Sequence, residues 1–188
     1  MSIVLLGSTS GSCTLQEQAV AGTTTLTLPT FNGTVGLLVS GTAVASTSGT
    51  SIDFTSIPAG VRRVTVMFSG VSSSGTSGFL VRLGDSGGIE TTGYVSSCST
   101  VASSVSTSSS TVGFLMEYSN AANNISGQMI ISNISGNLWV QSVSFTDGSQ
   151  SLFGSGSKTT SATLDRVRIT TTNGTDTFDA GTINILYE

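Results

Sequence analysis

Alternating apolar and polar residues recur in short runs from residue 51 onward, and each run is bounded by Gly, Asn or Ser. Val64, Val66 and Phe68 alternate with polar or smaller neighbours, and the same period of two recurs in 79–83, 138–145 and 183–187. Such runs are typical of half-buried β-strands. No stretch of ten residues keeps apolar residues at helical spacing without a Gly or a Ser/Thr cluster interrupting it. We therefore expect an all-β protein with about eight strands after residue 51, folded as an antiparallel β-sandwich of jelly-roll type.

The first 46 residues predict a different kind of structure. Residues 23–28 and 35–39 have strand character, but apolar side chains are too few there to form an independent core. We therefore divide the chain into an N-terminal β arm, residues 1–46, and a sandwich domain, residues 47–188. The arm is expected to attach to a partner. Its candidate contact residues are Phe31, Leu37 and Leu38.

Charge is scarce, and this limits the partners that the chain can have. Charged residues make up 9% of the sequence, against about 25% in an average soluble domain, while hydrophobic residues reach 37%. Disorder usually requires the reverse combination, so a buried core is expected. The 35 Ser, 29 Thr and 23 Gly indicate a surface of hydroxyls and backbone, typical of extracellular or virion-exposed shells. Six basic residues and a net charge of −4 argue against nucleic-acid binding.

The sequence does not decide the local structure of residues 96–111, and it predicts a turn within residues 163–188. Residues 96–111 are almost all Ser, Thr and Val, which is compatible with either a loop or a strand. Between residues 163 and 188, two β-branched runs flank Asn173-Gly174, which predicts a hairpin that ties the C-terminal residues into a sheet. Asp176 and Asp179 raise the possibility of a Ca²⁺ site, but the spacing lacks the ligand rhythm of an EF-hand loop, so a turn is preferred.

Catalytic chemistry has little to build on in this sequence. The chain contains no His, which removes the commonest general base and metal ligand. Asp85 and Glu90 flank a Gly-rich turn and could act as a glycosidase pair, bind a sugar, or simply form a tight turn in which Asp accepts from backbone N–H groups. We prefer the turn, and regard both residues as candidate exposed loop contacts. No catalytic residue, metal site or cofactor is predicted.

The cysteines and the single tryptophan are interpreted as structural. Cys13 and Cys98 allow one disulfide, but two buried thiols are preferred, and two Cys without His cannot form a structural zinc site. Trp139 is expected to anchor the core or a subunit interface rather than to stack on a sugar. No segment is long and apolar enough for membrane insertion, and residues 1–7 lack the positive region of a signal peptide.

Several segments resemble a known family. A β-rich module of structural proteins in tailed bacteriophages, including marine phages and cyanophages, is similar to residues 51–71, 83–94 and 164–188. Residues 7–29 resemble a short sequence segment of phage virion proteins. The resemblance implies a non-catalytic virion protein that is synthesised in the host cytoplasm without a signal peptide. The family brings no catalytic signature.

The length of the region before the sandwich favours one position on the virion. Fewer than fifty residues precede residue 47, too few for the trimeric shaft of a typical tail fibre. The resemblance therefore implies a homotrimeric capsid decoration (cement) protein on the outer capsid surface, with the major capsid protein as partner. The alternative is a short tail fibre or receptor-binding protein that attaches through a tail adaptor and contacts host surface glycans.

Overall fold

The computed structural model describes residues 2–6, 12–16, 36, 38–117, 121 and 123–188, which belong to two compact units, Met1–Val35 and Gly36–Glu188. In the first unit, β1 (Ser2–Leu6) pairs antiparallel with β2 (Ser12–Gln16). The strand predicted at 23–28 and the candidate contacts Phe31 and Leu37 lie outside the described residues. Leu38, the third candidate contact, is 61% exposed.

The second unit is built from two antiparallel sheets, and the described residues contain no helix, which confirms the all-β prediction. The larger sheet has the order β10-β9-β14-β13-β12-β6-β16-β3, with β4 also paired to β16. Its strands are β3 (Val39–Ser40), β4 (Val44–Ala45), β6 (Arg63–Ser73), β9 (Tyr94–Val101), β10 (Val105–Ser110), β12 (Ile125–Ser135), β13 (Leu138–Thr146), β14 (Ser151–Thr159) and β16 (Phe178–Tyr187). The smaller sheet has the order β11-β7-β15-β5, with β8 also paired to β7. Its strands are β5 (Ser51–Phe54), β7 (Phe79–Asp85), β8 (Gly88–Ile89), β11 (Phe114–Met116) and β15 (Arg166–Thr171).

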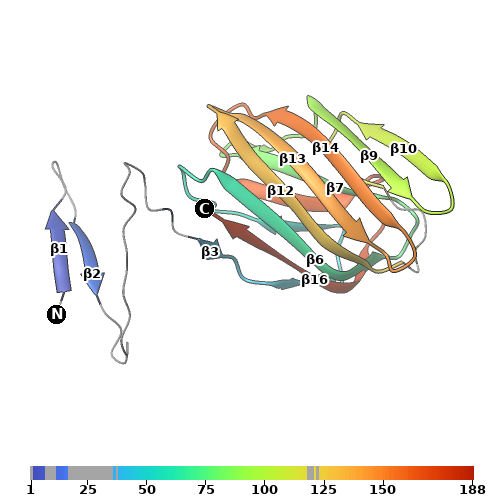
Figure 1. Ribbon diagram of the computed structural model, residues 1–188, viewed down its shortest axis with the longest axis horizontal. Helices are drawn as coiled ribbons and strands as arrows, with labels where there is room; N and C mark the ends of the chain where they lie inside the picture. The colour runs from blue at the N-terminus through green and yellow to red at the C-terminus, as the bar shows by residue number, and fades with distance from the viewer. Residues whose placement is uncertain (1, 7–11, 17–35, 37, 118–120, 122) are drawn as a thin grey trace. The chain divides into compact units, whose positions relative to one another are not determined.

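The core lies between the two sheets, and Figure 1 shows β7 of the smaller sheet behind β12, β13 and β14 of the larger one. Val64, Val66 and Phe68 of β6 are at most 4% exposed, whereas the residues between them are partly open to solvent. The alternation expected from the sequence is therefore present. Because each large apolar side chain contributes about 1.5–3 kcal/mol when fully buried, this two-layer core is what holds the sheets together.

Strand pairing follows a nested pattern in the sequence. β6 pairs with β16, β7 with β15, β9 with β14, and β12 with β13, so each pair encloses the next. Three of these pairs lie in the larger sheet, and the β7–β15 pair lies in the smaller one. The described residues from 51 onward form twelve strands, β5 to β16, rather than the eight expected, because strands such as β8 and β14 were not predicted from the sequence pattern.

Residues 178–187 are tied into a sheet and the Asn173-Gly174 turn is present, as predicted, but the strands on the two sides of the turn do not form the predicted hairpin. Gly174 has a φ of +70°, and the Asn173 side-chain oxygen accepts from the backbone N–H groups of Thr175 at 2.9 Å and Asp176 at 3.0 Å. The strands on either side, β15 and β16, belong to different sheets. The turn thus carries the chain from one layer to the other, because β15 and β16 find their partners in the much earlier strands β7 and β6.

The Ser/Thr-rich segment 96–111 forms strands rather than a loop. Most of it lies in the hairpin of β9 and β10, in which Val101 pairs with Val105. Ser96 and Cys98 point inward and are 4% and 2% exposed, and the Cys98 thiol is free. The buried Ser96 hydroxyl oxygen accepts from the backbone N–H of Leu115 at 2.9 Å, so a hydroxyl can occupy a core position here.

Two further features concern the edge of the larger sheet at β16. The short strands β3 and β4 pair with β16, although their residues fall inside the segment predicted to be an arm. β16 also carries register shifts around Ala180. Gly181 has a φ of +92°, and a Cβ at this position would lie 2.4 Å from the Gly70 carbonyl oxygen. A side chain is therefore excluded at this irregularity by backbone contact as well as by conformation.

Candidate functional site

The turn that carries the predicted loop contacts Asp85 and Glu90 is held by internal hydrogen bonds rather than left free for a ligand. Asp85 is 3% exposed, so the expectation of an exposed contact is wrong for this residue. Its carboxylate accepts from the Ser161 hydroxyl at 2.5 Å and from the backbone N–H of Gly87 at 2.7 Å. The Ser161 hydrogen bond, followed by the Gly87 N–H, holds the pKa of Asp85 below its usual range. The carboxylate is thus used to fix the turn, as the tight-turn interpretation proposed.

Glu90 forms an ion pair with Lys158, whose side chain is 7% exposed against 19% for Glu90. The other Glu90 oxygen accepts from the backbone N–H of Ser161 at 2.6 Å. The Lys158 ammonium lies 5.2 Å from the centre of the Tyr94 ring, within the range of a cation–π contact. Two carboxylates, one ammonium and one ring therefore join the β7–β8 turn to β14 and to Ser161, which leaves these groups little freedom to bind a ligand.

Tyr94 completes this cluster from inside the core. Its hydroxyl accepts from the backbone N–H of Leu83 at 2.7 Å and donates to the carbonyl of Glu90 at 3.1 Å. Burial raises the pKa of Tyr94, so the phenol stays neutral. The cluster has titratable groups, but all of them are committed to one another.

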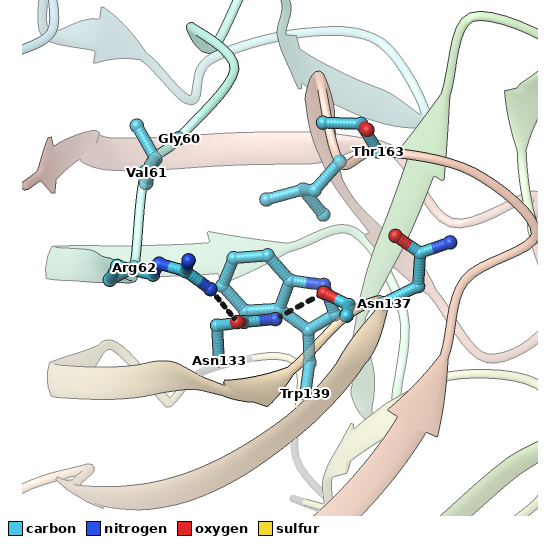
Figure 2. Close-up of a pocket in the computed structure, with 9 residues that line it drawn as sticks. Gly60, Val61, Arg62, Asn133, Asn137, Trp139 and Thr163 are labelled. Carbon is cyan, nitrogen blue, oxygen red and sulfur yellow. Dashed lines mark hydrogen bonds between the residues drawn. The ribbon is translucent and has the colours of Figure 1, made fainter.

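An open pocket of about 280 Å³ lies elsewhere, at one end of the sandwich. Three connections form it: the segment before β6, the β12–β13 turn, and the segment between β14 and β15. Figure 2 shows the Trp139 indole between Arg62 and Asn133 on one side and Asn137 on the other. The lining residues are Gly60, Val61, Arg62, Asn133, Gly136, Asn137, Trp139, Thr163 and Leu164.

Hydrogen bonds within this pocket hold one wall in place. The Arg62 guanidinium donates to the Asn133 side-chain oxygen at 2.6 Å. The Asn133 amide nitrogen in turn donates to the carbonyls of Gly136 at 2.9 Å and Leu138 at 3.2 Å. Both amide hydrogens of Asn133 are therefore used, and its side-chain oxygen fixes the position of Arg62 at the rim.

One polar group in the pocket has no partner within the described part of the chain. Trp139 is 4% exposed, and its indole N–H makes no hydrogen bond there. An unpaired buried donor costs about 1–3 kcal/mol, so native proteins seldom leave one without a reason. The sequence interpretation of Trp139 as a core anchor describes its burial but does not account for this donor.

A second surface, on the outer face of the larger sheet, is almost free of charge. Within β9, β10, β12, β13 and β14, the one charged residue is Lys158, which points inward. The outward residues are mainly Ser, Thr and aliphatic side chains, together with Phe153, which is 53% exposed. A shallow apolar groove on this face is lined by Gln128, Ile130, Ser142, Val143, Ser144, Phe153 and Gly154. A neutral face of this kind can be covered without desolvating ions.

Comparisons with known proteins add no family: no family model, no curated protein and no solved structure matches the chain. In the described residues there is no group of three or more His, Cys, Asp or Glu side chains placed to hold a metal ion. The same residues include no helix long and apolar enough to cross a bilayer.

The residues of the Trp139 pocket were not predicted from the sequence. Arg62, Asn133 and Asn137 lie far apart along the chain or in an ordinary turn, and no motif joins them. The signals that could have drawn attention to them were the single Trp and the Asn residues just before it. The predicted loop residues Asp85 and Glu90 were instead brought together with Lys158 and Ser161 in a structural cluster.

Proposed function

We propose that this chain is a non-catalytic structural protein of a tailed-phage virion, a homotrimeric decoration (cement) protein on the outer capsid surface. The observation that carries the proposal is the uncharged outer face of the larger sheet, taken with the resemblance of residues 51–71, 83–94 and 164–188 to phage virion proteins. The protein acts by adding contact area between neighbouring subunits rather than by chemistry.

The physical basis is the low cost of covering this face. Interface cores are depleted of charged residues, because a buried unpaired ion is expensive. Here five adjacent strands offer Ser, Thr and aliphatic side chains around Phe153 and the groove beside it. A stable interface buries about 800 Å² on each partner, and a face of this width can supply such an area. Three copies joined through it form the proposed trimer.

Attachment to the major capsid protein is assigned to residues 1–46. The contact residues proposed for it are Phe31, Leu37 and Leu38, of which Leu38 is described and exposed. The remainder of the surface, which carries most of the charged residues, such as the Asp53–Arg168 pair, would then face the exterior of the particle.

For the sandwich we propose a variant of the jelly roll. Four nested antiparallel pairs, outermost β6–β16 and innermost β12–β13, are the pairing pattern of a jelly roll. The variant differs in that the innermost pair lies in the same sheet as β6–β16 rather than in the opposite one. Jelly rolls are common among viral capsid domains, which agrees with the proposed function.

The experiment that tests the capsid position is a copy number. Densitometry of purified virions against the major capsid protein should give hundreds of copies per particle, and mild heating should release the protein while lowering capsid stability. Tens of copies or fewer would instead favour the alternative, a short tail fibre or receptor-binding protein. The open Trp139 pocket is the observation that favours that alternative.

The trimer has its own test in solution. Light scattering should give a trimer for the wild type, and Ser144→Asp, which places a charge on the outer face, should shift the mass toward the monomer. Thr55→Asp adds the same charge at an exposed position after β5 and should leave the trimer intact. A monodisperse wild-type monomer at micromolar concentration would overturn the trimer.

A further inference from the structure

We infer that β10 (Val105–Ser110) pairs edge to edge with β10 of a second copy of this chain, antiparallel and across a two-fold axis. β10 is the last strand at one end of the larger sheet, as Figure 1 shows, and no strand of the described residues pairs with its other side. Such an edge presents a row of backbone N–H and C=O groups that have no partner in the sheet. Another strand can be added here through backbone hydrogen bonds alone.

The other edge strands of the sandwich are short or carry charge. β3, β4, β8 and β11 have two or three residues each, and β5 has four. β5 also carries Asp53, whose ion pair with Arg168 places two charged side chains at that end of the smaller sheet. Short strands and charged side chains are common means by which proteins protect a sheet edge from pairing with another chain. Within the described part of the sandwich, β10 is therefore the longest edge strand and lacks this protection.

β10 also lacks the other features that block such pairing. Its six residues, Val-Ser-Thr-Ser-Ser-Ser, include no charged residue, no Pro and no Gly. All six pair with β9 in one unbroken register, so no bulge twists the edge away. Four of the six side chains are exposed and the other two are half-buried. A partner strand can therefore reach the edge along its whole length.

The absence of charge makes a second copy of the chain a suitable partner. In a two-fold antiparallel pair the strand lies against itself, so a charged residue near its middle would face its own copy, and like charges in opposite positions are destabilising. Neither β10 nor β9 carries a charged residue. Ser and Thr side chains can hydrogen-bond to one another across such a pair. An identical strand thus meets no repulsion here, whereas a charged strand would gain no ion pair.

The contact is small and does not depend on the proposed trimer. Six residues on each side bury less than the roughly 800 Å² per partner of a stable interface, so we expect weak association between isolated copies. Weak contacts become effective when many copies are held side by side, as on the surface of a particle. The pairing uses the backbone at the sheet edge, whereas the proposed trimer uses side chains of the outer face. Either one can therefore fail without the other.

Disulfide trapping at high protein concentration tests the geometry. Single cysteines are placed at Val105, Thr107, Ser108 and Ser110 in a Cys98→Ala background, and the disulfides are assigned by mass spectrometry. A two-fold axis near the middle of β10 brings residues 107 and 108 of the two copies within the Cα separation of about 7 Å that a disulfide allows, but leaves the two copies of residue 105 about 17 Å apart. Thr107→Cys or Ser108→Cys should therefore form a disulfide-linked dimer at least about tenfold faster than Val105→Cys and Ser110→Cys.

Three outcomes of this experiment would overturn the inference. Equal rates at the four positions would mean parallel pairing or random encounter. Rates no higher than that of Thr55→Cys, at an exposed position after β5, would mean that the edge does not pair. Cys13, in β2, is kept in all variants. A disulfide between Cys13 and the cysteine of Ser108→Cys would mean that the first unit of another copy occupies the edge.

A charged variant separates the edge from the outer face. Ser108 pairs with the inward-pointing Cys98, so its side chain lies on the side of the sheet opposite to the outer face. Sedimentation of the wild type at rising concentration should show association beyond the trimer, or beyond the monomer if the trimer proposal fails. Ser108→Lys should abolish this association, because two ammonium groups meet near the two-fold axis, and Thr55→Lys should not.

The same measurement can contradict the inference in two ways. Unchanged association in Ser108→Lys would mean that β10 is not the contact. Loss of the trimer itself in Ser108→Lys would place β10 in the trimer interface instead of at a separate two-fold contact. Thermal unfolding of each variant checks that the fold is retained.

Discussion

The buried Lys158–Glu90 pair allows a quantitative test of how the β7–β8 turn is held. Removing one partner of a buried ion pair costs about 3–5 kcal/mol, because the other charge is left desolvated. The side chains differ in exposure, 7% for Lys158 and 19% for Glu90. Glu90→Gln strands the more buried charge and should cost about 3 kcal/mol of the free energy of unfolding. Lys158→Met leaves a carboxylate that can reach solvent, so about 2 kcal/mol is expected.

The matched control is the Asp53–Arg168 pair on the smaller sheet. This pair is bidentate, with nitrogen–oxygen distances of 2.6 and 2.7 Å, but both side chains are 35% exposed. Arg168→Gln should therefore cost only about 0–1 kcal/mol in spite of the better geometry. Urea unfolding at neutral pH measures all three variants. Losses for Glu90→Gln and Arg168→Gln that agree within about 0.5 kcal/mol would refute the argument that burial decides the cost.

Three further predictions address the backbone, the core and the response to acid. Gly181→Ala should lower the free energy of unfolding by more than about 2 kcal/mol, because the new Cβ would clash with backbone atoms. The control is Gly148→Ala, which has a φ of +89° but no neighbour within 4 Å of the new Cβ, and it should cost only about 1 kcal/mol. Gln141→Met should raise the free energy of unfolding in urea by about 1–2 kcal/mol, because the buried Gln141 amide has no partner in the described residues. The control, Gln128→Met on the outer face, should change little. A loss of stability in Gln141→Met would mean that the amide is hydrogen-bonded. The pKa of Asp85 lies below 3.8 in the folded protein, so its contribution to stability is present above about pH 3.8 and is lost as the pH falls through the folded pKa. Melting temperatures followed below pH 3.8 should therefore fall less steeply in Asp85→Asn than in the wild type, and parallel curves would contradict this.

The fold class could be predicted because side-chain alternation is a local signal. Val64, Val66 and Phe68 reach the core through the period of the strand alone, whatever the strand pairs with. The segment 96–111 was ambiguous for a physical reason: Ser and Thr can lie on either face of a sheet when the buried hydroxyls are bonded, as that of Ser96 is. Buried and exposed positions in this segment therefore have the same residue types, and the sequence does not distinguish a strand from a loop.

Pairing and the candidate site could not be predicted, because both depend on contacts distant in sequence. Asn173-Gly174 correctly indicated a reversal of the chain, but a turn does not specify which strands will pair, and β15 and β16 pair in separate sheets. In the same way Arg62 and Asn133 meet only because β6 and β12 are neighbours. Asp85 was placed at a turn correctly, yet its burial depends on Ser161, which the sequence did not connect to it.

The pairing of β6 with β16 has a consequence for how the protein is made. Val64 pairs with Tyr187, so one long edge of the central strand β6 has no partner until the last of the described strands has been synthesised. Long-range pairing of this kind slows folding, and unpaired edges favour association with other chains. A nascent or truncated chain without residues 178–187 would expose an open β6 edge beside an uncharged sheet. Incomplete chains are therefore expected to aggregate during synthesis. Expression of a version that ends before β16 should yield insoluble protein.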